Sequence, residues 1–200
     1  MMHWPRQRWS WPAPGLGASD TALEILRRVA SADFPLLLDA DALNLLAAHP
    51  VLAVQIARRT AATVITPHPA EAARLLAITT EAVQADRVAA ALDLAQRVKA
   101  HVALKGCGTV IAHPDGSWRI NTNGNPGLAS GGSGDVLSGI AGALLAQGWP
   151  AAAALSASVY LHGAAADALV TTGDGPIGIA AGELIPVART LLNRLIDTNG

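Results

Sequence analysis

The chain has 200 residues, enough for one domain with a core of its own. Hydrophobic residues make up 51% of it, charged residues 14%, and the formal net charge is −1, which excludes a bulk attraction for nucleic acid or an anionic membrane. Cys107 is the only cysteine, which excludes an intramolecular disulfide and is typical of a reducing compartment.

The first residues of the chain, MMHWPRQRWSWPAP, hold Trp4, Trp9 and Trp11 among prolines and arginines and show no helical or strand period. We expect residues 1–14 to be an irregular segment and residues 15–200 to form one domain. A disordered or wrongly assigned terminus and an aromatic docking arm both fit this composition, and the former is favoured. No continuous apolar run follows the arginines, so we expect no secretory signal and a cytoplasmic protein.

Short apolar runs alternate with helical patterns along the rest of the chain. Strands are predicted within residues 34–40, 62–66, 101–105, 109–113 and 117–121, and the last two are joined by the turn residues 114–116. Helices are predicted from Ser19 or Asp20 to Ser31, from Asp41, from Pro50, from Pro69, from Thr79 or Thr80 to near Ala100, from near Asp135, from Pro150, and from Ala180 to Leu195. Repeated strand–helix units favour an α/β sandwich with a mostly parallel sheet.

Residues 151–170, AAAALSASVYLHGAAADALV, are apolar over a length that could span a membrane. Their apolar character comes mainly from alanine, and His162 and Asp167 interrupt it. We therefore predict a buried helix of a soluble protein, with no membrane contact. The two polar side chains are interpreted as satisfied core or interface groups.

The stretch NGNPGLASGGSGDVLSG, residues 123–139, is rich in glycine, and an alanine-rich helical pattern follows it. Gly131, Gly132, Ser133 and Gly134 can expose successive main-chain N–H groups, and the following helix adds its own free N–H groups and positive dipole end. This combination predicts an anion hole suited to phosphate. The P-loop and dinucleotide-binding motifs are absent, and a tight turn before a packed helix fits the glycines equally well.

Asp135 follows these glycines directly. Such a carboxylate can simply cap the helix. Beside a phosphate site it can also accept the proton of a hydroxyl group that attacks phosphorus, while the anion hole stabilises the charge on the transferring group. We interpret Asp135 as this catalytic base.

Three segments in order, TPHPAEAARLL (66–76), KGCGTVIA (105–112) and NTNGNPGLASGGSGDVLSG (121–139), resemble the ADP- or ATP-dependent NAD(P)H-hydrate dehydratases of the ribokinase-like superfamily. PGLG (14–17) and LDADALN (38–44) match as well, so the resemblance covers nearly everything from Pro14 onward. It implies a ribokinase-like three-layer α/β/α sandwich that lacks the N-terminal part of the family's domain.

The resemblance also implies a reaction that repairs nicotinamide cofactors. The family removes water from the S form of NADHX or NADPHX, the hydrates of NADH and NADPH. A nucleotide phosphorylates the hydroxyl group of the hydrate, and elimination of phosphate restores the reduced cofactor. Bacterial members typically use ADP and release AMP, whereas animal and fungal members use ATP. We therefore expect an ADP-dependent hydro-lyase, with ATP as the other possible nucleotide and with Mg²⁺ held largely by phosphates and water.

The site residues implied by the resemblance fall into three groups. Asp135 is the catalytic base and contacts the hydrated nicotinamide, which Gly17 and His68 also contact. The transferred phosphoryl group lies against the anion hole of residues 131–134. The residues implied to bind the nucleotide are Lys105, Gly106, Cys107, Gly108, Thr109 and Gly134.

Several of these residues have a simpler interpretation. His68 lies between two prolines and fits a rigid turn, Lys105 fits a solvated strand end, and Cys107 fits a packing or lining position better than a nucleophile. Three polar residues after the first predicted strand fit a strand end and a helix cap as well as a metal site, so no metal ligand is assigned to Asp39, Asp41 or Asn44.

Domains of this family normally begin well upstream of the GLG motif, so we expect an empty strand position in the sheet and a chain that is poorly soluble or weakly active alone. Expected partners are an NAD(P)H-hydrate epimerase, fused or separate, and further copies of the chain. Two other functions stay open: a kinase of a small vitamin alcohol such as hydroxyethylthiazole, and a non-catalytic nucleotide-binding fragment.

Overall fold

The computed structural model describes residues 15–197. Its centre is a five-stranded sheet with the order β1-β2-β3-β4-β5. The strands comprise Leu36–Leu38, Thr63–Ile65, His101–Leu104, Val110–Ala112 and Trp118–Ile120. Residues 1–14, with Trp4, Trp9 and Trp11, and residues 198–200 lie outside the described residues, so the expectations for the N-terminal segment and the domain bounds stay predictions.

β1, β2 and β3 run parallel, with Leu36 opposite Thr63 and Val64 opposite His101. β4 and β5 form an antiparallel hairpin on β3, and this hairpin turns at residues 113–117. All five predicted strands and the hairpin are therefore confirmed. β5 lies at the edge of the sheet, and its three residues are exposed.

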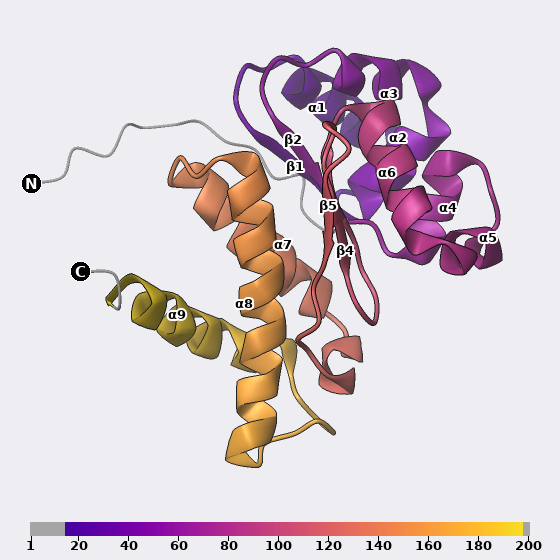
Figure 1. Cartoon of the computed structure of the whole chain (residues 1–200). Helices are drawn as coiled ribbons and strands as arrows, with labels where there is room; N and C mark the ends of the chain where they lie inside the picture. The colour runs from indigo at the N-terminus through magenta and orange to yellow at the C-terminus, as the bar shows by residue number, and fades with distance from the viewer. Residues whose placement is uncertain (1–14, 198–200) are drawn as a thin grey trace, which may run out of the picture.

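Helices cover both faces of the sheet, so the protein has three layers with the sheet in the middle (Figure 1). One face is covered by α1 to α6, which comprise Asp20–Ala30, Asp41–Ala48, Pro50–Ala57, Pro69–Leu76, Thr80–Ala85 and Arg87–Val98. The other face is covered by α7 (Ser133–Ala146) and α8 (Ala151–Thr172), and α9 (Ala181–Asp197) packs on these two helices. A short 3₁₀ helix, η1 (Pro126–Ala129), precedes α7.

The three leucines of β1 show how one strand serves two cores. Leu36 and Leu38 pack with the side chains of α1 to α6, whereas Leu37 packs with those of α7 and α8. All three are fully buried. Successive side chains of a strand point to opposite faces, so a strand covered on both sides needs a continuous apolar run.

The prediction of one long helix from Thr79 or Thr80 to near Ala100 was wrong, because the segment forms α5 and α6. Asp86 separates them with φ −144° and ψ 86°, and its side chain accepts a 2.9 Å hydrogen bond from the Ala89 N–H. A short acidic side chain that caps a new helix competes with continuation of the old one. The apolar periodicity continues across this break and conceals it.

By length and hydropathy α8 passes the test for a membrane span, but half of its apolar window is buried inside the protein. It packs against α7, α9 and the sheet. Its two polar interruptions have partners: His162 bonds to Ser133, and Asp167 accepts hydrogen bonds from Gly124 and Asn125. These contacts are those of a core helix.

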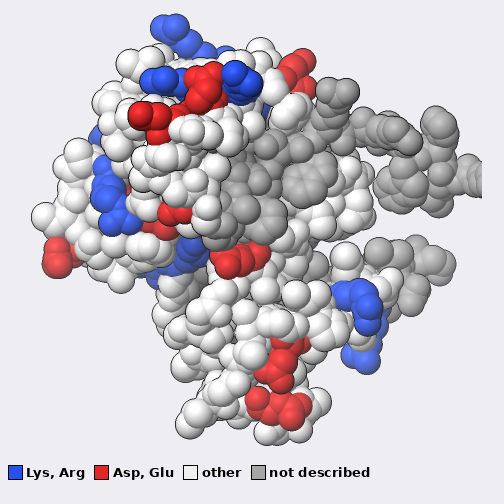
Figure 2. Space-filling view, turned by 180° about the vertical axis from the view of Figure 1, so that it is seen from behind, with Lys and Arg blue, Asp and Glu red and all other residues white. Residues whose placement is uncertain are grey.

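Charged side chains on the face seen from behind lie mostly over the half of the molecule that α1 to α6 form (Figure 2). Acidic and basic groups are interspersed there, and neither sign gathers into one large patch on this face. This distribution agrees with the net charge of −1.

Arg59 holds the C-terminal end of α1 against the sheet. Its Nε donates to Thr63 Oγ1 at 3.1 Å, and its Nη atoms donate to main-chain oxygens in the last turn of α1 and in the segment that leads to β1. The carbonyl groups that accept these bonds belong to Val29, Ala30, Ala32 and Phe34. A cation here satisfies carbonyls that the helix end leaves free and opposes the negative end of the helix dipole.

Arg59→Met is expected to lower the free energy of unfolding by about 2–4 kcal/mol, because several partly buried carbonyls lose a charged donor. Urea denaturation followed by circular dichroism measures this change. The neighbouring Arg58 is exposed and provides the control: Arg58→Met should change stability by no more than about 0.5 kcal/mol. Equal effects of the two substitutions would contradict the anchoring role.

Candidate functional site

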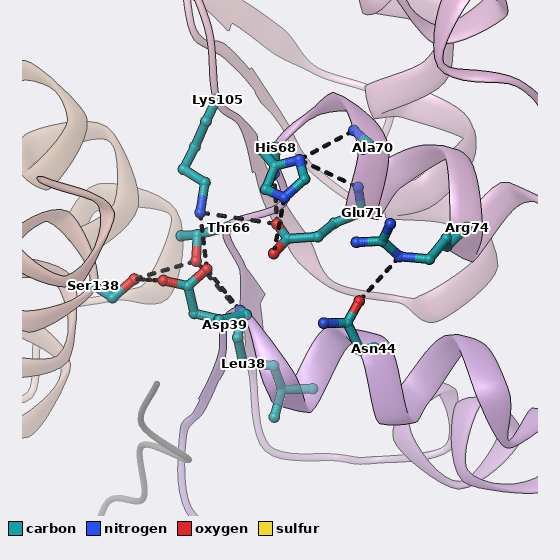
Figure 3. A network of polar contacts seen from close by, with 11 residues as sticks. Leu38, Asp39, Asn44, Thr66, His68, Ala70, Glu71, Arg74, Lys105 and Ser138 are labelled. Atoms are coloured by element: carbon teal, nitrogen blue, oxygen red, sulfur yellow. Dashed lines mark hydrogen bonds and ion pairs between the residues drawn. The ribbon is translucent and has the colours of Figure 1, made fainter. Parts of the chain in front are cut away.

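Three polar residues follow three neighbouring parallel strands: Asp39 follows β1, Thr66 follows β2 and Lys105 follows β3. The carboxyl ends of parallel strands meet at one edge, and Figure 3 shows these side chains converging there. This is the edge at which open α/β sheets bind ligands. The site is therefore built outward from these three residues.

Asp39 is 1% exposed and uses both of its carboxylate oxygens. Oδ1 lies 2.9 Å from Lys105 Nζ, and Oδ2 accepts a 2.6 Å hydrogen bond from Ser138 Oγ of α7. Because the Ser138 hydroxyl group donates its hydrogen bond to Asp39, the donor in its 3.3 Å contact with Thr66 is Thr66 Oγ1. These contacts join α7 and the Lys105 ammonium group to the ends of the strands.

His68 is the N-cap of α4 and forms a capping box with Glu71. Its ring Nδ1 accepts hydrogen bonds from the N–H groups of Ala70 and Glu71, and the main-chain N–H of His68 donates to Glu71 Oε2 at 2.7 Å. Glu71 is 5% exposed, and the same Oε2 lies 3.9 Å from Lys105 Nζ. The cap therefore turns a buried carboxylate toward the ammonium group.

His68 is a neutral imidazole at pH 7. Burial lowers its pKa; Glu71 opposes this effect, and Lys105 lowers the pKa further. Because Nδ1 accepts hydrogen bonds, the proton of the neutral ring is on Nε2, 3.3 Å from Glu71 Oε1. The side chain is 47% exposed, so the ring is both a helix cap and accessible from outside.

The PGLG segment is tied to the start of α2. Asp41 Oδ2 accepts hydrogen bonds from the N–H groups of Gly15, at 3.1 Å, and Gly17, at 2.9 Å. Both glycines have positive φ, 89° and 74°, a conformation that other residues rarely adopt.

Asn44, another polar residue after β1, has a different partner: its Oδ1 accepts a hydrogen bond from Arg74 Nε at 3.0 Å. The polar residues after β1 thus have separate partners, and the described residues contain no group of three or more His, Cys, Asp or Glu side chains placed to hold a metal ion.

A cavity of about 510 Å³ opens beside Lys105. Its walls are the loop after β3, the loop after β5, and the first turn of α7 together with one side of α8. The lining residues include Lys105, Gly106, Cys107, Gly108, Thr109, Asn121, Asn123, Gly124, Asn125, Ser133, Gly134, His162 and Gly163. Cys107 is exposed, as a lining residue would be.

α7 begins beside the Lys105 ammonium group. Gly132 is the N-cap with φ 83°, and Ser133 is the first helical residue. A Cβ atom on Gly134 would lie 3.5 Å from Lys105 Nζ. The positive end of the helix and a lysine ammonium group therefore face the same space, which favours an anion there.

Asp135 lies on this same first turn, and its side chain is exposed. The carboxylate of Asp135 makes no hydrogen bond or ion pair with another described residue. A free carboxylate on the outer side of the turn is available to a ligand that lies against it.

α8 braces both sides of the cavity. Ser133 Oγ and His162 Nε2 lie 3.0 Å apart, and Asp167 accepts hydrogen bonds from the Gly124 N–H at 2.8 Å and Asn125 Nδ2 at 3.0 Å. Gly163 allows close contact, since a Cβ atom there would lie only 2.8 Å from the main-chain oxygen of Asn123. The interpretation of His162 and Asp167 as satisfied polar groups is confirmed, and both hold cavity walls in place.

The structure brings most of the candidate residues into one region. The cavity is lined by residues 105–109, from Lys105 to Thr109, and by Ser133 and Gly134. The turn at the start of α7 also holds Gly131, Gly132 and Asp135, but these three residues do not line the cavity. His68 reaches the cavity through Glu71 and Lys105, and Gly17 lies on the segment that Asp41 holds.

Sequence reasoning missed the roles of Asp39 and Ser138. Asp39 carried one usable signal, because it lies near the end of a predicted strand, as Lys105 does. Ser138 carried none, since a serine inside an alanine-rich helix looks like a small packing residue.

A family model described as NAD(P)H-hydrate dehydratase matches residues 13–184. An ADP-dependent (S)-NAD(P)H-hydrate dehydratase of Neisseria meningitidis is 46% identical over 183 residues, and a bifunctional NAD(P)H-hydrate repair enzyme of Coxiella burnetii is 43% identical over 180. The match covers 90% of this chain in both cases but 62% and 35% of those proteins, so the chain spans less than two thirds of the length of either relative.

Among solved structures, an ADP/ATP-dependent NAD(P)H-hydrate dehydratase from Bacillus subtilis, co-crystallised with ATP and Mg²⁺, superimposes with a TM-score of 0.81 at 31% identity. The match covers 94% of this chain and 64% of that one. A ribokinase-like superfamily protein from Enterococcus faecalis gives a TM-score of 0.76 at 28% identity. The expected ribokinase-like fold is confirmed.

His162 makes stability fall on acidification. Burial lowers its pKa to about 4, although a hydrogen bond with Ser133 opposes this. The unfolded chain takes up a proton near pH 6.5 and the folded chain only near pH 4, so this contribution is fully present above pH 6.5 and is lost as the pH falls toward 4. Between pH 7.5 and pH 5 the loss should be about 2 kcal/mol.

Urea denaturation at both pH values measures the loss of stability. His162→Gln should remove the part of this loss that is due to His162. Ring ¹⁵N chemical shifts should show a neutral His162 down to pH 5. A ring that titrates near 6.5, or an equal pH dependence in the two proteins, would contradict this assignment.

Proposed function

The chain belongs to the NAD(P)H-hydrate dehydratase family, and on that premise we propose that it catalyses the ADP-dependent dehydration of (S)-NADHX or (S)-NADPHX to NADH or NADPH, with release of AMP and phosphate. One observation carries the proposal. The Lys105 ammonium group and the first turn of α7 face the same space, and on that turn lies Asp135, an exposed carboxylate with no partner among residues 15–197. In the proposal these groups are a phosphoryl-binding site and the base beside it.

In the proposed reaction, ADP occupies the cavity with its terminal phosphoryl group against Lys105 and the anion hole of residues 131–134, of which Ser133 and Gly134 line the cavity. The hydroxyl group of the hydrate attacks phosphorus, and Asp135 accepts its proton. The bond between phosphorus and the AMP oxygen breaks, and AMP leaves. The C–O bond of the phosphorylated hydrate then breaks, phosphate departs with the electron pair, and loss of a proton restores the dihydronicotinamide.

The N–H groups at the start of α7 and the Lys105 ammonium group stabilise the charge on the phosphoryl group during transfer. They are held in place before the ligand arrives, since Ser133 is tied to His162 and Lys105 to Asp39. Pre-organised donors of this kind need no rearrangement as charge develops. This arrangement supports phosphoryl transfer rather than simple phosphate binding.

The hydrate is proposed to lie between Asp135, His68 and Gly17. A neutral His68 suits this position, because its ring is half exposed and adds no positive charge that would compete with Lys105 for phosphate. Gly17 offers main chain without a side chain, on a segment that Asp41 holds. The contacts of His68 and Gly17 with the substrate are part of the proposal.

Mg²⁺ is proposed to accompany the nucleotide. Asp39 and Glu71 are buried carboxylates that share one ammonium group, at 2.9 Å and 3.9 Å, so this corner carries two negative charges against one positive charge. They are the protein groups that would face such an ion, and phosphates and water supply most of its ligands. The ion would neutralise phosphate charge during transfer.

ADP is the proposed nucleotide, with ATP as the other one, because the Neisseria relative is named ADP-dependent and the Bacillus structure ADP/ATP-dependent. The bifunctional Coxiella relative supports an NAD(P)H-hydrate epimerase, fused or separate, as a functional partner. Association with further copies of the chain and a cytoplasmic location complete the proposal.

The direct test is incubation of the protein with ADP, Mg²⁺ and NADHX, followed by the near-ultraviolet absorbance of NADH. We expect absorbance to return in step with AMP and phosphate release, and not to return without nucleotide. Phosphorylation of hydroxyethylthiazole without NADH recovery would favour a vitamin-alcohol kinase. Nucleotide binding without any turnover would favour a non-catalytic fragment.

Asp135→Asn should lower kcat by at least about 100-fold, because the amide cannot accept the hydroxyl proton. The dissociation constant for ADP, measured by titration calorimetry, should change by no more than about threefold, since the N–H groups and Lys105 remain. Asp93→Asn, an exposed acid on α6, is the matched control and should leave both quantities unchanged. A variant that retains most of its turnover would remove Asp135 from the role of base.

A further inference from the structure

The loop from Lys105 to Thr109 is held by Arg87, a residue that does not line the cavity. Arg87 Nη1 donates to the Cys107 main-chain oxygen, and Nη2 donates to that of Leu104 at 3.0 Å. The two acceptors lie on either side of Lys105. One guanidinium group therefore holds both ends of the turn that carries the lysine.

The fit between Arg87 and the loop is close. Gly106 has φ +147°, and a Cβ atom there would lie 2.8 Å from Arg87 Nη2. Arg87 Nε is buried and has no hydrogen-bond partner among the described residues. The guanidinium group thus takes up the orientation that serves the two carbonyls and leaves its Nε–H unsatisfied, which costs free energy.

The position of Arg87 follows from the break between α5 and α6. Asp86 caps α6, and Arg87 is the first residue of that helix. One continuous helix would have placed this side chain differently. The break that the apolar pattern conceals therefore has a consequence at the cavity.

Turning the carbonyl groups toward Arg87 has an effect on the opposite side of the loop. The C=O and N–H of a trans peptide point in opposite directions, so the Cys107 carbonyl that faces Arg87 leaves the Gly108 N–H pointing away from it. The N–H groups of Gly106, Cys107 and Gly108 make no hydrogen bond with another described residue. All three residues line the cavity. Successive N–H groups in a turn are the kind of group that binds anions in proteins.

We propose that Arg87 is a positioning residue for nucleotide phosphate: by holding the Leu104 and Cys107 carbonyls, it keeps the N–H groups of Gly106, Cys107 and Gly108 and the Lys105 ammonium group directed at the phosphates. Arg87 does not touch the ligand. The inference rests on the proposed function in one respect, which is that the cavity holds a nucleotide.

The test measures the affinity of Arg87 variants for ADP, AMP and adenosine by titration calorimetry. Arg87→Met removes both hydrogen bonds and should weaken ADP by about 10-fold or more, because the loop loses its fixed orientation. Adenosine should change by no more than about twofold, since it carries no phosphate. Arg87→Lys keeps the charge and one donor group and should fall between Arg87→Met and the unaltered protein.

The matched control is Arg97→Met, on the last turn of the same helix, where the arginine is exposed and pairs with Asp93. It should leave all three affinities unchanged. In the dehydration assay, Arg87→Met should raise KM for ADP by about the same factor as the dissociation constant and change kcat by no more than about threefold. A residue with a purely structural role would not divide its effect between KM and kcat in this way.

Two results would overturn the inference: unchanged ADP affinity in Arg87→Met, or an equal loss for ADP and adenosine, which would indicate general collapse of the cavity. Should Arg87→Met fail to fold, Arg87→Lys alone decides through its ratio of ADP to adenosine affinity. An unaltered protein that binds no ADP would overturn the proposed function as well. Binding by the unaltered protein with unchanged ADP affinity in Arg87→Met would overturn only the role of Arg87.

Discussion

The ion pair between Asp39 and Lys105 joins the first and third parallel strands at their carboxyl ends, and the site is organised around it. A carboxylate that is 1% exposed requires a partner, because an unpaired buried charge costs several kcal/mol. Lys105 supplies it from β3, and Ser138 supplies a second contact from α7. The pair therefore sets the position of the lysine and of the helix whose first turn faces it.

Three loops of this region are each held by one side chain from a neighbouring helix. Asp41 of α2 holds the segment with Gly17, Arg87 of α6 holds the loop after β3, and Asp167 of α8 holds Gly124. The glycines leave the loops without side chains that could stiffen them, so rigidity has to come from outside. Main chain that would otherwise be mobile is thereby ordered before a ligand binds, which lowers the entropy lost on binding.

Much of the fold could be predicted, because its signals are local. Apolar runs such as the three leucines of β1 predict strands, Ser19 and Pro69 predict helix starts, and the glycine–aspartate stretch predicts the first turn of α7. The helix break at Asp86 was missed, because a capping side chain interrupts the helix without disturbing the apolar period. Asp39 was seen at a strand end, but its partner depends on which strands are neighbours.

The sequence by itself determined the alternation of strands and helices, the glycine loop with its acid, and the resemblance that led to a reaction, since each depends on residues close together in the chain. Only the tertiary structure decided which distant side chains meet: Asp39 with Lys105, Arg87 with the loop that carries this lysine, and His162 with Ser133. The reason is that a local pattern determines how a segment folds and which of its faces is apolar. The order of strands in the sheet and the packing of helices on it determine what each polar group can reach.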